Sequence, residues 1–303
     1  MRMVDRLAPT SPDASLPVSG LTPMPAYAEL QCFSNFSFLR GVSHAEELAQ
    51  RAAQLGYSAL AITDDCSLAG VVRAHVEAEK AGLPLIIGAT FTLVSNDAQS
   101  PSLELVLLAC NIEGYGNLSE LITLARTRTG KGHYRLTLED LATPSPKHAA
   151  LRGMPDCLAI LVPSYPALPA DDVLLTQAHW VARAFPGRAW LGLTLHARAM
   201  DDLHRGTVER AAAAAAIPMV ALGSVTMHVR SRKPLHDVFS AIHVGRPLSE
   251  CGYALSSNAE SHLRSRLRLA NLYPARALAE TMALVQIGGL NLLHYAAQKS
   301  GDR

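Results

Sequence analysis

The sequence lacks the features that would place it in a membrane or outside the cell. No apolar run reaches the ~18 residues of a membrane-spanning helix, and residues 1–25 contain no continuous apolar core of the signal-peptide kind. Basic and acidic residues nearly cancel, at 27 against 26, so the net charge neither favours nor excludes a nucleic-acid partner. These absences predict a cytoplasmic protein without a membrane partner.

Cysteine is scarce and shows no regular spacing. Five cysteines are scattered over 303 residues, and none belongs to a Cys-x-x-Cys pair. Disulfide and zinc frameworks depend on paired or regularly spaced cysteines. We therefore expect a reducing compartment in which the cysteines serve as small apolar residues.

Phosphate-binding glycine loops are also missing, because no GxGxxG or GxxxxGK[ST] motif follows any apolar run. What is present is a repeated alternation of strand-length apolar runs with segments of helical period. The runs are continuous, as is typical of strands covered on both faces, and they lie at 28–33, 58–63, 83–94, 103–110, 156–162, 188–195 and 217–225. About seven such units predict a parallel α/β sheet, and the missing loops favour a closed barrel over an open sheet.

Helices are predicted between these runs. For the first helix, Ser43 is the expected N-cap with Glu46 three residues on, and Gly56 stands where the helix should end. The predicted segments are 46–56, 69–82, 115–126, 171–185 and 201–216.

Composition divides the chain into three parts. Residues 1–25 are rich in Pro, Ser and Thr and are predicted to be a disordered leader. Residues 26–235 hold the barrel pattern. Residues 236–303 form a helical extension, with helices expected at 236–245, 259–274 and 274–286 and a loop over 246–261, while the last ~20 residues are atypical.

Catalytic side chains of a parallel α/β barrel lie at the carboxyl ends of its strands. A hydrolytic metal centre with several ions needs imidazoles and carboxylates that converge there. This sequence offers two aspartates and one histidine, which are too few, because the residues at the predicted ends are Gln31, Phe33, Asp64, Asp65, Thr90, His196, Ser224 and Thr226.

Asp64 and Asp65 have two interpretations. Their carboxylates either cap the helix predicted at 69–82, worth about 1 kcal/mol, or remain as metal ligands, and the small number of ligands favours capping. His196 is predicted to be a hydrogen-bonded histidine at a strand end. Cys66 has no base near it in the sequence, so it is not predicted to be a nucleophile.

Two basic clusters could meet phosphate groups, although a solvated charged face is the favoured interpretation of both. Tyr134 is the aromatic residue that accompanies them, which makes the signal for single-strand binding weak. The clusters are Arg126, Arg128, Lys131 and Arg135, and Arg230, Arg232 and Lys233.

Several long strings match a known family in order: YAELQCFSNFSFLRG, ALAITDDCSLAGVVRAH, PLIIGATFTL, EGYGNLSELITLAR, GHYRLTLEDL and HVRSRKPLHDV. Together they resemble the N-terminal PHP (polymerase and histidinol phosphatase) domain of bacterial C-family DNA polymerases, and above all its error-prone branch. The resemblance runs from about residue 27 to about residue 280. It implies a distorted, TIM-like (β/α)7 barrel, in agreement with the strand pattern.

The same resemblance identifies departures at the family's metal motifs. Gln31 and Phe33 stand where metal-binding members have the two histidines of HxH, and Thr90 stands where they have glutamate. The TDH or TDE motif is Thr63-Asp64-Asp65, and the GDVH pattern near the last strand is the stretch 223–226. The remaining candidate ligands are Asp64, Asp65 and His196. We therefore expect neither catalytic residues nor a cofactor, with zinc or manganese at a degenerate site as the alternative.

Three functions compete for this chain. The first is a non-catalytic structural PHP domain of an error-prone polymerase, whose partners would be polymerase or translesion-synthesis proteins, with DNA met through the parent polymerase. The second is a phosphoesterase with a reduced metal site. The third is a module that binds nucleic acid through Arg230, Arg232 and Lys233. The family's palm and fingers are missing from this sequence, so a truncated or split gene is expected, and the chain alone should not polymerise DNA.

Overall fold

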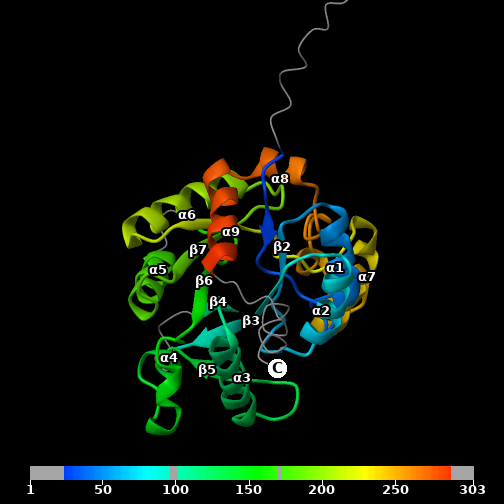
Figure 1. Ribbon diagram of the computed structural model, residues 1–303. Coiled ribbons are helices and arrows are strands. Elements are labelled where there is room, and N and C mark those ends of the chain that lie inside the picture. The colour runs from blue at the N-terminus through cyan, green and yellow to red at the C-terminus, as the bar shows by residue number, and fades with distance from the viewer. Residues whose placement is uncertain (1–23, 96–101, 169–171, 288–303) are drawn as a thin grey trace, which may run out of the picture.

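The computed structural model describes residues 24–95, 102–168 and 172–287 (Figure 1). Within these residues the strands form one sheet, in the order β1-β2-β3-β4-β6-β7-β8, and β5 pairs with β3 outside this path. The strands are β1 (Ala28–Glu29), β2 (Ala59–Ile62), β3 (Leu85–Val94), β4 (Leu103–Ala109), β5 (Leu136–Thr137), β6 (Cys157–Val162), β7 (Ala189–Thr194) and β8 (Met219–Leu222). Seven of them correspond to the predicted apolar runs. The short β5 was not predicted.

Backbone hydrogen bonds between the segments that follow β1 and β8 close this sheet into a barrel. Phe33 N donates to Val225 O at 2.8 Å, and Val225 N donates to Gln31 O at 2.9 Å. Cys32 and Val225 thereby form a parallel bridge between the first and last strands of the seven-strand path. The predicted α/β barrel is confirmed.

The prediction of a wholly parallel sheet is wrong for β4. This strand runs antiparallel to both of its neighbours, β3 and β6. Its connection from Val94 to Leu103 is shorter than the dozen or so residues that a parallel crossover requires. The reversed strand is one source of the barrel's distortion. It also brings the start of β4, rather than its end, to the end of the barrel where the parallel strands finish.

Helices separate most of the strands along the chain, but β4 follows β3 directly, and α7, α8 and α9 all come after β8. Figure 1 shows the helices around the outside of the barrel. In the described part of the chain, no helix is both long and apolar enough to cross a membrane. The α-helices are α1 (Ala45–Gln54), α2 (Val71–Lys80), α3 (Ile112–Thr127), α4 (Glu139–Ala142), α5 (Asp172–Ala184), α6 (Asp201–Ala215), α7 (Lys233–Val244), α8 (Arg266–Leu272) and α9 (Ala275–Ile287). Short 3-10 helices are η1 (Pro146–Leu151), η2 (Arg230–Arg232), η3 (Leu248–Glu250) and η4 (Gly252–Ala254).

Two details of the helix predictions are wrong. The helix expected at 259–274 is confined to α8, because His262 forms a parallel bridge with Met227 and holds the preceding residues extended. Ser43 does not cap α1. The helix begins after His44, whose backbone N–H donates to Glu47 at 2.9 Å, while the Ser43 hydroxyl bonds to the imidazole of His228 at 2.8 Å.

The barrel interior is an apolar core separate from the one beneath the outer helices. Successive strand residues point to opposite faces, so each strand contributes to both cores. Leu284 of α9 is the one member of the interior core that comes from a helix, and the core comprises Ala28, Leu30, Ala59, Ala61, Ile86, Val106, Leu108, Leu158, Ile160, Trp190, Val220, Leu222 and Leu284.

Helix α9 closes the end of the barrel where the parallel strands begin (Figure 1, red). Trp190 Nε1 donates to Glu280 at 2.8 Å, and Ala28 N donates to the Thr281 hydroxyl at 3.3 Å. Leu284 is 1% exposed, while Ile287 at the end of the same helix is 53% exposed. The helix is therefore an integral part of the barrel's packing.

Replacing Leu284 by alanine should leave a cavity in the interior core and lower the free energy of unfolding by about 2–5 kcal/mol. Urea denaturation followed by circular dichroism measures this change. The matched control is Ile287→Ala, which should change the free energy of unfolding by no more than about 0.5 kcal/mol. Equal effects of the two substitutions would show that α9 does not close the barrel as described.

Candidate functional site

The carboxyl end of the barrel is filled by a chain of contacts that starts at Gln31. This side chain is fully buried, and its Nε2 donates to Glu104 Oε1 at 2.8 Å. Arg40 Nη2 donates to both oxygens of Glu104, at 3.0 and 3.1 Å. The Arg40 guanidinium carbon lies 3.7 Å from the ring centroid of Phe33, which is also fully buried, in a cation–π contact. Gln31 thus serves as a hydrogen-bond donor at this end of the barrel, and Phe33 fills it with an apolar ring.

These contacts span the end of the barrel rather than joining neighbours in the sheet. Gln31 follows β1 and Glu104 lies in β4, with β2 and β3 between them in strand order. Glu104 pairs with Val162 at the end of β6, which places it at the carboxyl end of the parallel strands. Sequence analysis missed Arg40 and Glu104, because 64 positions separate them and no local pattern marks either.

Asp64 binds the turn that follows β1 and does not cap α2, so the predicted capping role is wrong. Its Oδ1 accepts the backbone N–H of Ser34 at 2.8 Å and the hydroxyl of Ser37 at 2.6 Å, while Oδ2 accepts the hydroxyl of Ser34 at 2.7 Å. The N-cap of α2 is Gly70, where a Cβ would lie 2.7 Å from Asp64 Oδ2. Burial raises the pKa of the Asp64 carboxyl, and the hydrogen bonds from Ser37 and Ser34 oppose that rise.

Asp65 does not cap α2 either, and it instead contacts residues of the first basic cluster and its neighbour Tyr134. Its Oδ1 accepts the hydroxyl of Tyr134 at 2.9 Å, and its backbone carbonyl accepts Arg126 Nη2 at 3.1 Å. Burial raises the pKa of Tyr134, and the charge of Asp65 raises it further. Arg126, which the sequence offered as a phosphate contact, and Tyr134, the aromatic residue beside that cluster, thus make contacts within the domain.

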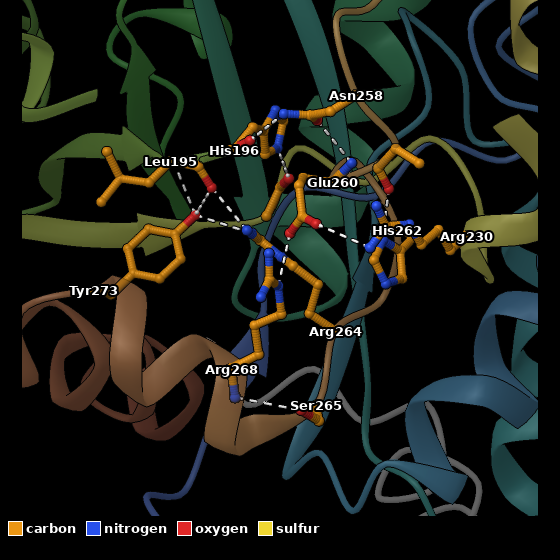
Figure 2. A network of polar contacts seen from close by, with 12 residues as sticks. Leu195, His196, Arg230, Asn258, Glu260, His262, Arg264, Ser265, Arg268 and Tyr273 are labelled. Carbon is orange, nitrogen blue, oxygen red and sulfur yellow. Dashed lines mark hydrogen bonds and ion pairs between the residues drawn. The ribbon is translucent and has the colours of Figure 1, made fainter. Parts of the chain in front are cut away.

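His196 is a hydrogen-bonded histidine at the end of β7, as predicted (Figure 2). Its Nε2 lies 2.7 Å from Gly223 O, and its own carbonyl accepts Asn258 Nδ2 at 2.7 Å. Because a carbonyl can only accept, Nε2 carries the proton of the neutral ring. Burial, together with the charge of Arg264, lowers the pKa of His196 to about 3. The imidazole is therefore neutral at physiological pH.

Arg264 lies beside His196 at the centre of a buried network (Figure 2). This arginine is 2% exposed. Its Nη1 donates to Leu195 O at 2.7 Å, and its Nη2 donates to the Tyr273 hydroxyl at 3.1 Å. The same hydroxyl donates to Leu222 O at 2.7 Å. The network ties the ends of β7 and β8 to α8 and the residues around it, and sequence analysis did not single out any of its members except His196.

The donor set at this end does not fit a metal centre with several ions. Within the described residues, no group of three or more His, Cys, Asp or Glu side chains is arranged to hold a metal ion. Both oxygens of Asp64 accept hydrogen bonds from serines, His196 directs Nε2 at a carbonyl, and Gln31 and Phe33 offer an amide and a phenyl ring.

The three residues predicted to contact nucleic acid each face a carboxylate. Arg230 lies 3.7 Å from Glu260, Arg232 lies 2.5 Å from Glu47, and Lys233 lies 2.5 Å from Asp237. The local charge is therefore largely balanced. Contact of these three residues with nucleic acid stays a prediction.

Comparison with known proteins identifies a family whose sequences match part of this chain. The PHP domain family matches residues 29–156. An error-prone DNA polymerase of Bordetella parapertussis is 62% identical over 263 residues, which cover 87% of this chain and 25% of that protein. The error-prone DNA polymerase of Burkholderia mallei is 53% identical over 268 residues, covering 86% of this chain and 25% of the relative.

Two solved structures are more distant. A proposed metal-dependent phosphoesterase from Bifidobacterium adolescentis superposes with a TM-score of 0.43 at 14% identity, covering 66% of this chain and 88% of the other. An amidohydrolase from Chromobacterium violaceum gives a TM-score of 0.46 at 15% identity, covering 65% of this chain and 86% of the other.

The barrel described above thus contains the segment that matches the PHP domain family, which runs from Glu29 in β1 to Asp156 just before β6. The chain is similar in sequence to one part of the error-prone DNA polymerases. It spans about a quarter of the length of the curated relatives that it matches.

The neutral state of His196 should make folding sensitive to acid. The histidine takes up its proton near pH 6.5 when unfolded but only near pH 3 when folded, so the unfolded state binds more protons and the free energy of unfolding falls as the pH drops below 6.5. Between pH 7.5 and pH 5 this group should account for a loss of about 2 kcal/mol.

Urea denaturation of the wild type and of His196→Gln at both pH values measures that share, because the other histidines contribute equally to both proteins. The variant should lose about 2 kcal/mol less than the wild type between the two pH values. Identical losses would show that His196 is not held in its neutral form.

Proposed function

We propose that this chain is the non-catalytic PHP portion of an error-prone DNA polymerase, acting in the cytoplasm in DNA repair and translesion synthesis. The observation that carries the proposal is the filled carboxyl end of the barrel, where Gln31, Phe33, Arg40 and Glu104 contact one another. The 62% identity to an error-prone polymerase supports the choice of parent protein.

The chemistry of the filled end supports a structural role. Hydrolysis at a PHP-type site would need imidazoles and carboxylates that are free to bind a dication. Here the Arg40 guanidinium already supplies a positive charge to Glu104, and Phe33 lies against that guanidinium. The carboxylate is therefore neutralised by a side chain of the protein itself.

The same contacts brace the barrel. The amide of Gln31 and the carboxylate of Glu104 meet across two intervening strands, so they restrain β1 against β4 at the carboxyl end of the barrel. Helix α9 restrains the opposite end through Trp190 and Glu280. A barrel restrained at both ends is suited to hold a fixed shape within a larger protein, which is the role we propose.

Purified without chelators, the protein should contain no stoichiometric zinc or manganese by plasma mass spectrometry, and it should hydrolyse no phosphomonoester, because the residues of the candidate site make contacts with one another. The alternative function, a phosphoesterase with a reduced site, predicts the opposite. Stoichiometric metal together with phosphatase activity, both lost in Asp64→Ala and in His196→Gln, would overturn the proposed function. Two variants are needed because Asp64 also holds the turn after β1.

The structural role can be tested directly in a full-length polymerase. Replacing the matched portion of the Bordetella parapertussis enzyme by the matched residues of this chain should preserve primer extension, because the domain contributes its fold and no reacting group. Extension is measured on undamaged templates and on templates with an abasic site. A soluble, folded chimera that extends neither template would contradict the proposal.

A further inference from the structure

Helix α7 leaves an apolar stripe exposed. Leu235, Val238, Phe239 and Ile242 follow the i, i+3, i+4, i+7 spacing that places side chains on one face of a helix. Val238 is 43% exposed and Ile242 is 58% exposed, and neither Leu235 nor Phe239 is buried. Ala241 is the one residue of this helix that the structure buries.

The segment after α7 also carries exposed apolar side chains. The short helices η3 and η4 pack beside α7. They carry Leu248, which is 47% exposed, and Tyr253, which is fully exposed. Arg246 and Glu250, both exposed, are the charged residues within this segment. We call the exposed side chains Val238, Ile242, Leu248 and Tyr253 the α7 face.

Helix α2 also exposes two apolar residues one turn apart, Val72 and Val76, whereas several other helices bury theirs. The apolar residues of α1, for instance, face the barrel, where Leu48, Ala49 and Ala52 are fully buried. Figure 1 shows α7 at the edge of the molecule, on the same side as α1 and α2. A contiguous group of exposed apolar side chains commonly marks an interaction site, and here it occurs on a helix whose charges are paired internally, as between Lys233 and Asp237.

We propose that the α7 face docks against the part of an error-prone DNA polymerase that this chain does not match, which makes up about three quarters of the length of its relatives. The inference rests on the proposed function and names the surface through which the PHP domain would meet its parent protein. The relatives match this chain over 25% of their length, so a protein of this kind has ample further surface to cover the face. An amphipathic helix with anchors at i, i+3 and i+7 fits an apolar groove, and the internal pairing of Lys233 leaves little net charge for an acidic partner to bind.

Hydrogen exchange tests the proposal on two intact proteins, this 303-residue chain and the natural Bordetella parapertussis polymerase. Amides of α7 in this chain should exchange about tenfold or more faster than those of the aligned segment in the polymerase, because docking suppresses local opening. Helix α1, which is buried against the barrel in this chain, provides the internal reference and should exchange at similar rates in both.

A pair of substitutions tests the side chains themselves. Val238→Asp with Ile242→Asp should leave the Tm of this chain unchanged, since both residues are exposed. The same changes at the aligned positions of the polymerase should lower its Tm and speed exchange of the segment. Val72→Asp is the matched control, because Val72 of α2 is 71% exposed and lies outside the α7 face. It should leave both proteins unchanged.

Equal exchange of α7 in the two proteins would overturn the docking proposal. Concentration-dependent dimerisation of this chain that the double substitution abolishes would also overturn it, in favour of a second copy as occupant. The proposed function fails separately, through metal-dependent phosphatase activity or an inactive chimera, and neither of those results alters the exchange of α7.

Discussion

One buried carboxylate spans the seam of the barrel. Glu29, at the end of β1, accepts the backbone N–H groups of Leu30 and Gln31 at 3.1 Å each, and that of Gly223 after β8 at 2.9 Å. Its other oxygen accepts the Tyr27 hydroxyl at 2.9 Å. A carboxylate that is 1% exposed would be costly without such donors. This side chain closes the first strand against the last together with the backbone hydrogen bonds of Val225 to Gln31 and Phe33, and the contacts at the carboxyl end rest on the resulting alignment of β1 with β8.

Gly223 illustrates how closely that seam is packed. A Cβ at this position would lie 2.0 Å from Glu29 Oε2, so no larger residue fits without displacing the carboxylate. Arg264, buried on the same side, contributes a positive charge that lowers the pKa of Glu29 against the rise caused by burial. The Glu29 carboxyl and the Arg264 guanidinium are thus both buried and both hydrogen-bonded near the place where the sheet closes.

Most of the strands could be predicted well from the sequence because each of them lies in a continuous apolar run, which is visible without knowledge of distant contacts. The sequence could not predict the direction of β4, since hydrophobic pattern is the same in either direction and only the short connection reveals the reversal. The first helix start was misplaced by one residue, from Ser43 to His44, because both candidates have a glutamate three residues on. The contacts of Arg40 with Glu104 and of Arg264 with Leu195 join residues 64 and 69 positions apart, and no local pattern encodes such pairs. The family motifs identified where the site lies, whereas the contacts that fill it could be found only in the structure.

The chain of contacts from Gln31 through Glu104 and Arg40 to Phe33 makes these positions interdependent. Gln31→His would replace the amide that donates to Glu104, and Phe33→His would replace the phenyl ring beneath Arg40 by a smaller, polar one. Each single replacement breaks an existing contact before any second ligand is present to share a metal, and effects at touching residues do not add. A metal centre could therefore be installed in this barrel only by several coordinated substitutions, so the packing itself acts as a barrier between the present sequence and a metal-binding one.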